Sequence, residues 1–277
     1  MQDLIEALRQ NIMGVEAGLL VAAICSYIGV YVVLKRIVFV GASLAQISSA
    51  GVALAFLLGL DYPFVADHPL VVSSVVTLVG VLIYSQQTLS RKIPQESVIG
   101  LGYLIASALS LMFIARIPKG EEEVKELLQG SIVLVQARDL EIMVVVFLLV
   151  AIVHGLFYKQ FLFVSFDRET AATQGYQVRL WELLFYLLLG VTISTAIQYA
   201  GLLSTFAYMV IPAVTGLLVA HKMRTAFVVA IVSALLSTFI GFAWAINSDL
   251  PTSPPTIGVA TIIMAVIWIS RRFVKEA

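Results

Sequence analysis

The sequence predicts an all-α fold, a polytopic integral membrane bundle with eight to nine spans. Of the 277 residues, 60% are hydrophobic and only 12% are charged, and the mean hydropathy is +1.00. Soluble domains carry about 25% charged residues. The apolar stretches are also close to the roughly 20 residues that a membrane span needs. Because the polar loops between them are short, we expect residues 1–277 to form a single transmembrane domain.

The first expected element is an interfacial helix in residues 1–12. Leu4, Ile5, Leu8 and Ile12 recur at helical spacing and make an apolar stripe, which suits a helix lying on the bilayer surface. The segment lacks the basic n-region and small-residue cleavage site of a signal peptide. We therefore expect an anchor helix before the first span.

Nine apolar stretches follow, and each is a candidate span. Gln198–Gly201 forms the turn between the sixth and the seventh, and one short or broken segment would reduce the number to eight. The stretches are residues 13–34, 38–60, 70–84, 98–114, 140–157, 180–200, 202–220, 226–246 and 256–269.

The distribution of Lys and Arg predicts the orientation of these spans. Cytoplasmic loops should hold the excess of basic residues. Placing the Lys35–Arg36 loop inside and alternating outward puts twelve of the 17 Lys and Arg residues on the cytoplasmic side. The N-terminus is then outside and the C-terminus is cytoplasmic.

The chain carries none of the sequence motifs of a membrane enzyme or an ATPase. There is no phosphate-binding loop, no H-E-x-x-H zinc motif and no G-x-S-x-G elbow. Zero net charge gives no indication of nucleic-acid binding, and the lone Cys25 excludes a disulfide framework. We attribute Glu16 and Glu182 to snorkelling near span ends, and expect His154 to be a hydrogen-bonded structural residue. No catalytic residue or cofactor is expected, which makes a membrane enzyme or scaffold a remote alternative to a transport protein.

A polar segment at residues 165–179 interrupts the apolar sequence on the predicted cytoplasmic side. Asp167 can cap the N-terminus of a short helix, Glu169 suits the first-turn dipole, and Gly175 can close the helix. A charged helix between two spans has little use in lipid. The segment is therefore a candidate contact for a soluble cytoplasmic motor.

Acidic residues gather in the predicted outer loops, above all Glu121, Glu122, Glu123 and Glu126. Such a surface could dock a soluble partner with a basic rim or gather cations. The alternative is a solvated face that merely follows the positive-inside bias.

Four segments carry a resemblance to a known family. They are residues 36–53, residues 128–132, the polar segment with its Phe-Asp-x-Glu-x-Ala-Ala-x-x-Gly pattern, and residues 200–203 with 210–213 followed by 249–254. Together and in this order, the chain resembles the membrane permease subunits of ABC importers for zinc, manganese and iron over essentially its whole length.

The resemblance implies a type II ABC importer-like fold and a transport subunit rather than an enzyme. It implies three partners: a cytoplasmic ATP-binding-cassette ATPase, an extracytoplasmic solute-binding protein and a second permease copy, expected to form a homodimer although a heterodimer stays open. The location would be a bacterial or archaeal cytoplasmic membrane. Residues 165–179 would be the coupling helix that rests on the ATPase, through Phe166, Asp167, Glu169, Ala171, Ala172 and Gly175.

One departure from the family concerns the metal path. Family members commonly have Asp directly after the glycine of the second span and His four residues later, whereas this chain has Ala42 and Gln46. Positions 42, 46, 49 and 53 lie within about 60° of one another on a helix, so Ala42, Gln46, Ser49 and Ala53 form the candidate translocation face. No metal ligand is certain there, because neutral amides and hydroxyls bind transition metals poorly.

Three interpretations of this face stay open. The cargo is a transition metal ion that is held weakly while the binding protein selects it. Alternatively, the cargo is a metal chelate or another small solute. In the third interpretation, Gln46 and Ser49 only bond neighbouring helices, as polar residues in membrane bundles often do.

Overall fold

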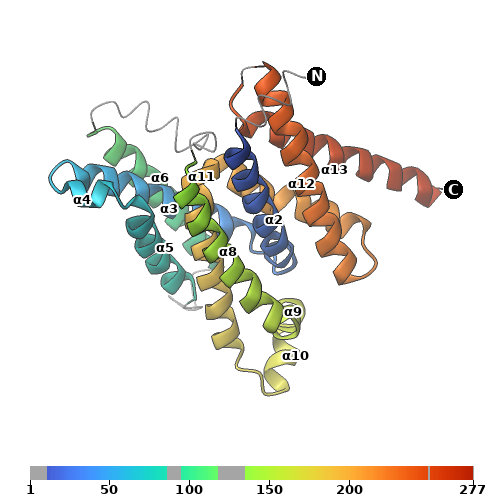
Figure 1. Ribbon diagram of the computed structural model, residues 1–277. Coiled ribbons are helices and arrows are strands. Elements are labelled where there is room, and N and C mark those ends of the chain that lie inside the picture. The colour runs from blue at the N-terminus through green and yellow to red at the C-terminus, as the bar shows by residue number, and fades with distance from the viewer. Residues whose placement is uncertain (1–10, 86–94, 118–134, 249, 277) are drawn as a thin grey trace. The chain divides into compact units, whose positions relative to one another are not determined.

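The computed structural model describes residues 11–85, 95–117, 135–248 and 250–276, and over these residues the chain is helical with no strand (Figure 1). The helices form two compact units. One comprises Met1–Val33, Leu128–Phe147 and Tyr199–Ala277, and the other comprises Leu34–Leu127 and Leu148–Gln198. We call them the outer-sequence unit and the middle-sequence unit. The predicted all-α fold is confirmed, whereas the single domain stays a prediction.

Seven of the described helices are long and apolar enough to cross a membrane, slightly fewer than the eight or nine spans predicted. The predicted stretch 70–84 lies in the shorter helix α5 (Pro69–Ser85). The predicted sixth and seventh stretches both lie in α11 (Val178–Val219). Because α11 has 42 residues, its helical length of about 63 Å is twice the roughly 30 Å of a hydrocarbon core.

Gly201 interrupts α11 at the turn that the sequence predicts. Its φ of 77° and ψ of 169° are not helical, and this region of backbone space is essentially restricted to glycine. The residues on the two sides of Gly201 are therefore two helices, each about as long as one span, joined at a kink.

The middle-sequence unit is built around α3 (Val38–Gly59), which contacts α5 and α6 (Gln95–Ile114). The short helix α4 (Pro63–Ala66) joins α3 to α5 and begins at a proline, whose fixed φ suits the first helical position. At Gly51 an added Cβ would lie 2.7 Å from the Ser73 Cα of α5. This glycine therefore lets the two helix backbones approach closely.

The same unit continues through the end of α8 (Ala137–Leu156) into α9 (Tyr158–Phe166), α10 (Arg168–Thr173) and the first part of α11. His154 near the end of α8 is buried, and its Nδ1 lies 3.1 Å from the Val150 carbonyl oxygen. Its ring also stacks on Phe161 of α9, with the centroids 4.7 Å apart. The predicted structural role of His154 is confirmed.

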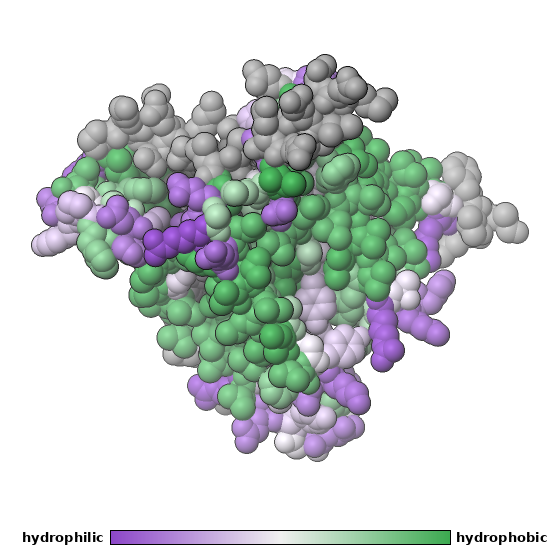
Figure 2. All heavy atoms as spheres, viewed as in Figure 1, coloured by the Kyte–Doolittle hydropathy of each residue, from purple (hydrophilic) through white to green (hydrophobic). Residues whose placement is uncertain are grey.

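The outer-sequence unit contains α2 (Ile12–Leu34) up to Val33, the second part of α11, α12 (Met223–Ser248) and α13 (Ser253–Glu276). Hydroxyl groups link its helices: Ser204 donates to Ser253 over 2.7 Å, and Thr238 donates to Tyr208 over 3.1 Å. Many large apolar side chains of both units are exposed, and Figure 2 shows hydrophobic residues over much of the visible surface. An apolar exterior is what lipid requires of membrane helices.

Candidate coupling site and translocation face

Helix α10 begins at a side-chain cap. Asp167 has extended backbone angles, and its carboxylate accepts hydrogen bonds from the Thr170 N–H at 2.9 Å and from the Thr170 hydroxyl at 2.6 Å. These bonds to Thr170 lower the pKa of Asp167, because they favour the charged carboxylate. Glu169 lies in the first turn, where negative charge suits the helix dipole. The N-terminal cap predicted from the sequence is confirmed.

Helix α10 ends in a Schellman motif. The Tyr176 N–H donates to the Ala171 carbonyl oxygen and the Gly175 N–H donates to the Ala172 carbonyl oxygen, each over 3.1 Å. Gly175 has a φ of 84°, which costs glycine nothing and strains other residues. The predicted closing role of Gly175 is confirmed.

The helix is shorter than the polar segment that contains it. It covers Arg168–Thr173, whereas Ser165 and Phe166 belong to α9, and Val178 begins α11. The reason is that both caps act at fixed positions, Asp167 at one end and Gly175 at the other. The segment 165–179 therefore holds a six-residue helix between two longer ones.

The coupling residues predicted from the sequence divide into an exposed and a buried set. Phe166 is 63% exposed, and Asp167, Glu169, Ala172 and Gly175 are exposed too. Ala171 is fully buried in a cluster with Val164, Val178, Phe163 and Trp181. Ala171 therefore fixes α10 against α9 and α11, and the exposed residues form the surface open to a partner.

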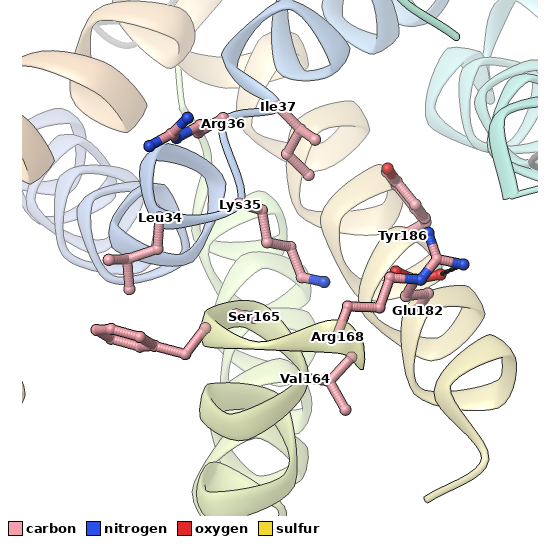
Figure 3. A pocket seen from close by; sticks show the side chains of 10 residues that line it. Leu34, Lys35, Arg36, Ile37, Val164, Ser165, Arg168, Glu182 and Tyr186 are labelled. Carbon is pink, nitrogen blue, oxygen red and sulfur yellow. Dashed lines mark ion pairs between the residues drawn. The ribbon is translucent and has the colours of Figure 1, made fainter. Parts of the chain in front are cut away.

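A cavity of about 500 Å³ lies beside the start of α10 (Figure 3). Residues from the α2–α3 connection, from α9 and α10, and from α11 line it. Arg168 of α10 forms an ion pair with Glu182 of α11 at 3.5 Å. In Figure 3 the Lys35 ammonium points toward this pair, while the Arg36 side chain extends in a different direction.

Lys35 is the most desolvated cation of this cavity. Burial lowers the pKa of Lys35, the negative charge of Glu182 opposes that shift, and the positive charge of Arg168 adds to it. The Lys35 ammonium also lies 5.4 Å from the centroid of the Phe185 ring, within cation–π range. The residue after it, Arg36, has a φ of 58°, which is uncommon outside glycine.

The snorkelling interpretation of Glu182 is wrong. The residue is buried, and its carboxylate pairs with Arg168 instead of reaching water. Sequence reasoning also missed the role of Lys35 in the same cluster. The available signal was an acidic residue one turn inside an apolar stretch, because such a charge needs a partner.

The four residues predicted to line the translocation path differ in their burial and in their contacts. Ala42 and Gln46 are half-buried. Ser49 is buried with its Oγ 3.5 Å from the Ser110 Oγ of α6, and Ala53 is buried in a cluster with Val52 and Ile114. Ser49 thus makes the kind of contact between helices that the third interpretation of this face expected.

Other predicted site residues lie outside the described residues: the interfacial helix up to residue 10, the four loop glutamates, and residues 128–132. In the part of the chain that the structure describes, no group of three or more His, Cys, Asp or Glu side chains could hold a metal ion. Among these residues, therefore, no such cluster offers an alternative metal site to the α3 face.

Long apolar helices, with a short capped helix exposed between two of them, are the architecture of an integral membrane protein. The chain belongs to the ABC 3 transport family, whose pattern matches residues 8–271. Family membership confirms the resemblance seen in the sequence. It also confirms that the chain is a permease subunit of an ABC transporter and not an enzyme.

Two of three relatives compared with this chain carry metal transport names. The manganese transport system membrane protein MntC of Halalkalibacterium halodurans is 24% identical over 91% of this chain and 84% of its own length. A Haemophilus influenzae relative named a probable iron transport system membrane protein is 24% identical over 90% of this chain and 86% of its own. An uncharacterized membrane protein of Synechocystis is 28% identical over 98% of this chain and 95% of its own.

Two solved structures share the fold. PsaBC from Streptococcus pneumoniae, in complex with Fab, superposes with a TM-score of 0.84 at 21% identity, covering 96% of this chain and 95% of that one. An inward-facing transporter assigned to the metal-chelate type superposes with a TM-score of 0.71 at 18% identity, covering 94% and 85%. The type II importer-like fold predicted from the sequence is confirmed by these likenesses.

Proposed function

We propose that the chain is the permease of an ABC importer that carries a transition metal ion, manganese, iron or zinc, across a bacterial or archaeal cytoplasmic membrane. The observation that carries this proposal is family membership over residues 8–271 together with relatives named for manganese and iron transport. Those relatives align over about nine-tenths of the chain. The transport path would therefore lie among the helices that these alignments cover.

The composition of the α3 face favours a path that holds the ion weakly. Ala42 and Gln46 offer no carboxylate or imidazole, and amide oxygens bind transition metals less well than those groups. Selection of the metal would then rest with the solute-binding protein outside. A weak path still conducts, since an ion must be able to leave each site.

The test is metal uptake by the reconstituted complex of permease, ATPase and binding protein. We expect one of manganese, iron or zinc to stimulate ATP hydrolysis and to enter vesicles only when ATP is present on the ATPase side. Absence of uptake for all three free ions, with an active ATPase, would contradict the proposal.

A metal chelate is the second candidate cargo, favoured by the same lack of ligands at Ala42 and Gln46. The double substitution Ala42→Asp with Gln46→His separates the two. For a free-ion cargo, the new ligands one turn apart should bind the metal more tightly and slow its release. For a chelate cargo, the same change should abolish native transport without conferring uptake of the bare ion.

The exposed residues of α10 would contact the ATPase, with two permease copies and two ATPases in the complex. Support comes from the exposure of Glu169 and Ala172 on a helix that is fixed at both ends, and of Phe166, the last residue of the preceding helix α9. Cysteines at positions 169 and 172 should cross-link to the ATPase, whereas a cysteine at the buried position 171 should not. Cross-linking at 171 alone would contradict this surface.

The orientation and the outer docking site are proposals from the sequence. The α10 side would be cytoplasmic, and Glu121, Glu122, Glu123 and Glu126 would help to seat the binding protein on the other side. Reversing the charge of Glu121, Glu122 and Glu123 should slow docking and reduce its salt dependence, because long-range attraction is screened by salt. An unchanged association rate would leave the loop as a solvated face.

A further inference from the structure

We propose that the cavity beside α10 is a binding site for a phosphate-type anion, held by Lys35 and Ser165 with Arg168 at its rim. The cavity of about 500 Å³ falls in the range of about 300–1,000 Å³ typical of ligand pockets. Three of its ten lining residues are basic (Lys35, Arg36 and Arg168) and one is acidic, Glu182. The lining therefore has an excess of positive charge.

The first observation is that the cavity holds more basic groups than acidic ones. Glu182 already forms an ion pair with Arg168 at 3.5 Å. This single carboxylate therefore has to balance the charges of both Arg168 and Lys35. Burial lowers the pKa of Lys35 in spite of that carboxylate. Lys35 is half-buried, and a partly desolvated charge is stabilised by a countercharge of its own. An anion placed next to Lys35 would supply it.

The second observation is an unsatisfied hydroxyl. Ser165 lines the cavity and is only 8% exposed, and its Oγ has no hydrogen-bond partner among the described residues. A buried hydroxyl without a partner is costly and calls for an explanation such as a ligand. Its O–H can donate to an anion oxygen, as can the three hydrogens of a lysine ammonium.

The third observation is where the cavity lies along the chain. Leu34, the last residue of the apolar helix α2, lines it, and so do Val164 and Ser165 near the end of α9. The site is therefore at the ends of helices, on the side rich in Lys and Arg. A phosphate group there could come from the headgroup of an anionic lipid or from free phosphate in solution, and the chemistry is the same.

An occupied site would join the connection that precedes α3 to the start of α10 through one ligand. Lys35 belongs to the connection, Ser165 is the last residue but one of α9, and Arg168 opens α10. The anion would bind in this cavity whichever cargo the permease transports.

The experiment uses the purified permease–ATPase complex and measures its midpoint of thermal unfolding. One arm adds inorganic phosphate to the complex in neutral detergent, against sodium chloride at equal ionic strength. The other arm compares nanodiscs of phosphatidylcholine with nanodiscs that also contain phosphatidylglycerol. A saturable rise in the midpoint only with phosphate identifies free phosphate, and a rise only with phosphatidylglycerol identifies the lipid headgroup.

The variants are Lys35→Met and Ser165→Ala, with Arg179→Met as the matched control, since Arg179 is an exposed basic residue nearby in the chain. We expect Lys35→Met to remove most of the shift and Ser165→Ala to weaken binding several-fold, while Arg179→Met keeps the wild-type response. Should Lys35→Met fail to fold, Lys35→Arg keeps the charge and should keep the shift. A wild-type response in both Lys35→Met and Ser165→Ala, or no response in either arm, overturns the proposal.

Discussion

Helix α10 is held by hydrogen bonds at its own two ends, whereas helix α3 is held by contacts with neighbouring helices. The ends of α10 are fixed by bonds within ten residues of sequence, from the Asp167 carboxylate at one end to the Gly175 turn at the other. Helix α3 has no side-chain cap at its N-terminus. Small residues and hydroxyls hold it instead, such as Gly51 against Ser73, and Ser48 with its Oγ 2.7 Å from the Ser73 Oγ.

The difference follows from the surroundings of the two helices. A six-residue helix that buries only Ala171 has little packing to stabilise it, so its own caps must satisfy its terminal groups. A helix of a membrane bundle gains nothing from burying apolar surface, because lipid is equally apolar, and depends on close approach and hydrogen bonds. Substitutions should therefore damage α3 through packing and α10 through its surface and its caps.

The largest effect is expected from Gly51→Ala. Its Cβ would meet the backbone of α5 at Ser73, and overpacking of this kind typically costs about 1–3 kcal/mol. The matched control is Gly100→Ala in α6, where nothing lies within 4 Å of the added atom. That change should be neutral or stabilising by up to about 1 kcal/mol. Thermal unfolding measures both, and equal midpoints for the two variants would show that α3 and α5 do not pack this tightly.

The next effect is expected from Glu169→Arg on the exposed side of α10. If this surface contacts the ATPase, coupled uptake should fall about tenfold, equivalent to about 1.4 kcal/mol of lost interaction, while the protein stays folded and inserted. Arg179→Met serves as an exposed control nearby. Uptake and ATPase stimulation that both survive Glu169→Arg would show that α10 is not the coupling surface.

A smaller effect separates the two halves of the α3 face. Cysteines at the half-buried positions 42 and 46 should react with water-soluble thiol reagents several times faster than a cysteine at position 49, because Ser49 is buried against Ser110. Cysteines at 44 and 47 are the controls, since Leu44 and Ile47 lie near Gly80 of α5. Protection of both 42 and 46 would remove this face from the path.

The smallest effect is expected at the cap of α10. Asp167→Ala should speed amide hydrogen exchange in residues 168–173 without changing the global midpoint, while Asp167→Asn should retain most of the cap. The sign of the pH dependence follows from the depressed pKa of Asp167. The charged cap contributes fully above the unfolded carboxyl pKa and is lost as the pH falls through the lower folded pKa. The measured quantity is the protection of the α10 amides relative to an unfolded chain at the same pH. Protection that does not fall over this acid range would contradict the cap.

Most of the fold could be predicted from the sequence, and the prediction differs from the structure mainly in the number of spans. All nine predicted apolar stretches match described helices to within one residue, and the break at Gly201 falls where the sequence predicts a turn. Seven described helices meet the length criterion for a span, slightly fewer than predicted, because α5 has only 17 residues and the two stretches of α11 count as one element of 42 residues with a kink at Gly201. Hydropathy alone does not indicate how two adjacent apolar stretches are joined at a glycine.

The chain by itself determined the features that depend on neighbours in sequence: the apolar stretches, the caps Asp167 and Gly175, and the family pattern over residues 8–271. Tertiary structure alone decided which residues meet across helices. It paired Glu182 with Arg168, turned Lys35 toward them, and packed Ser49 against Ser110. The physical reason is that caps are closed by atoms three to five residues apart, whereas a buried charge or hydroxyl must find its partner on another helix.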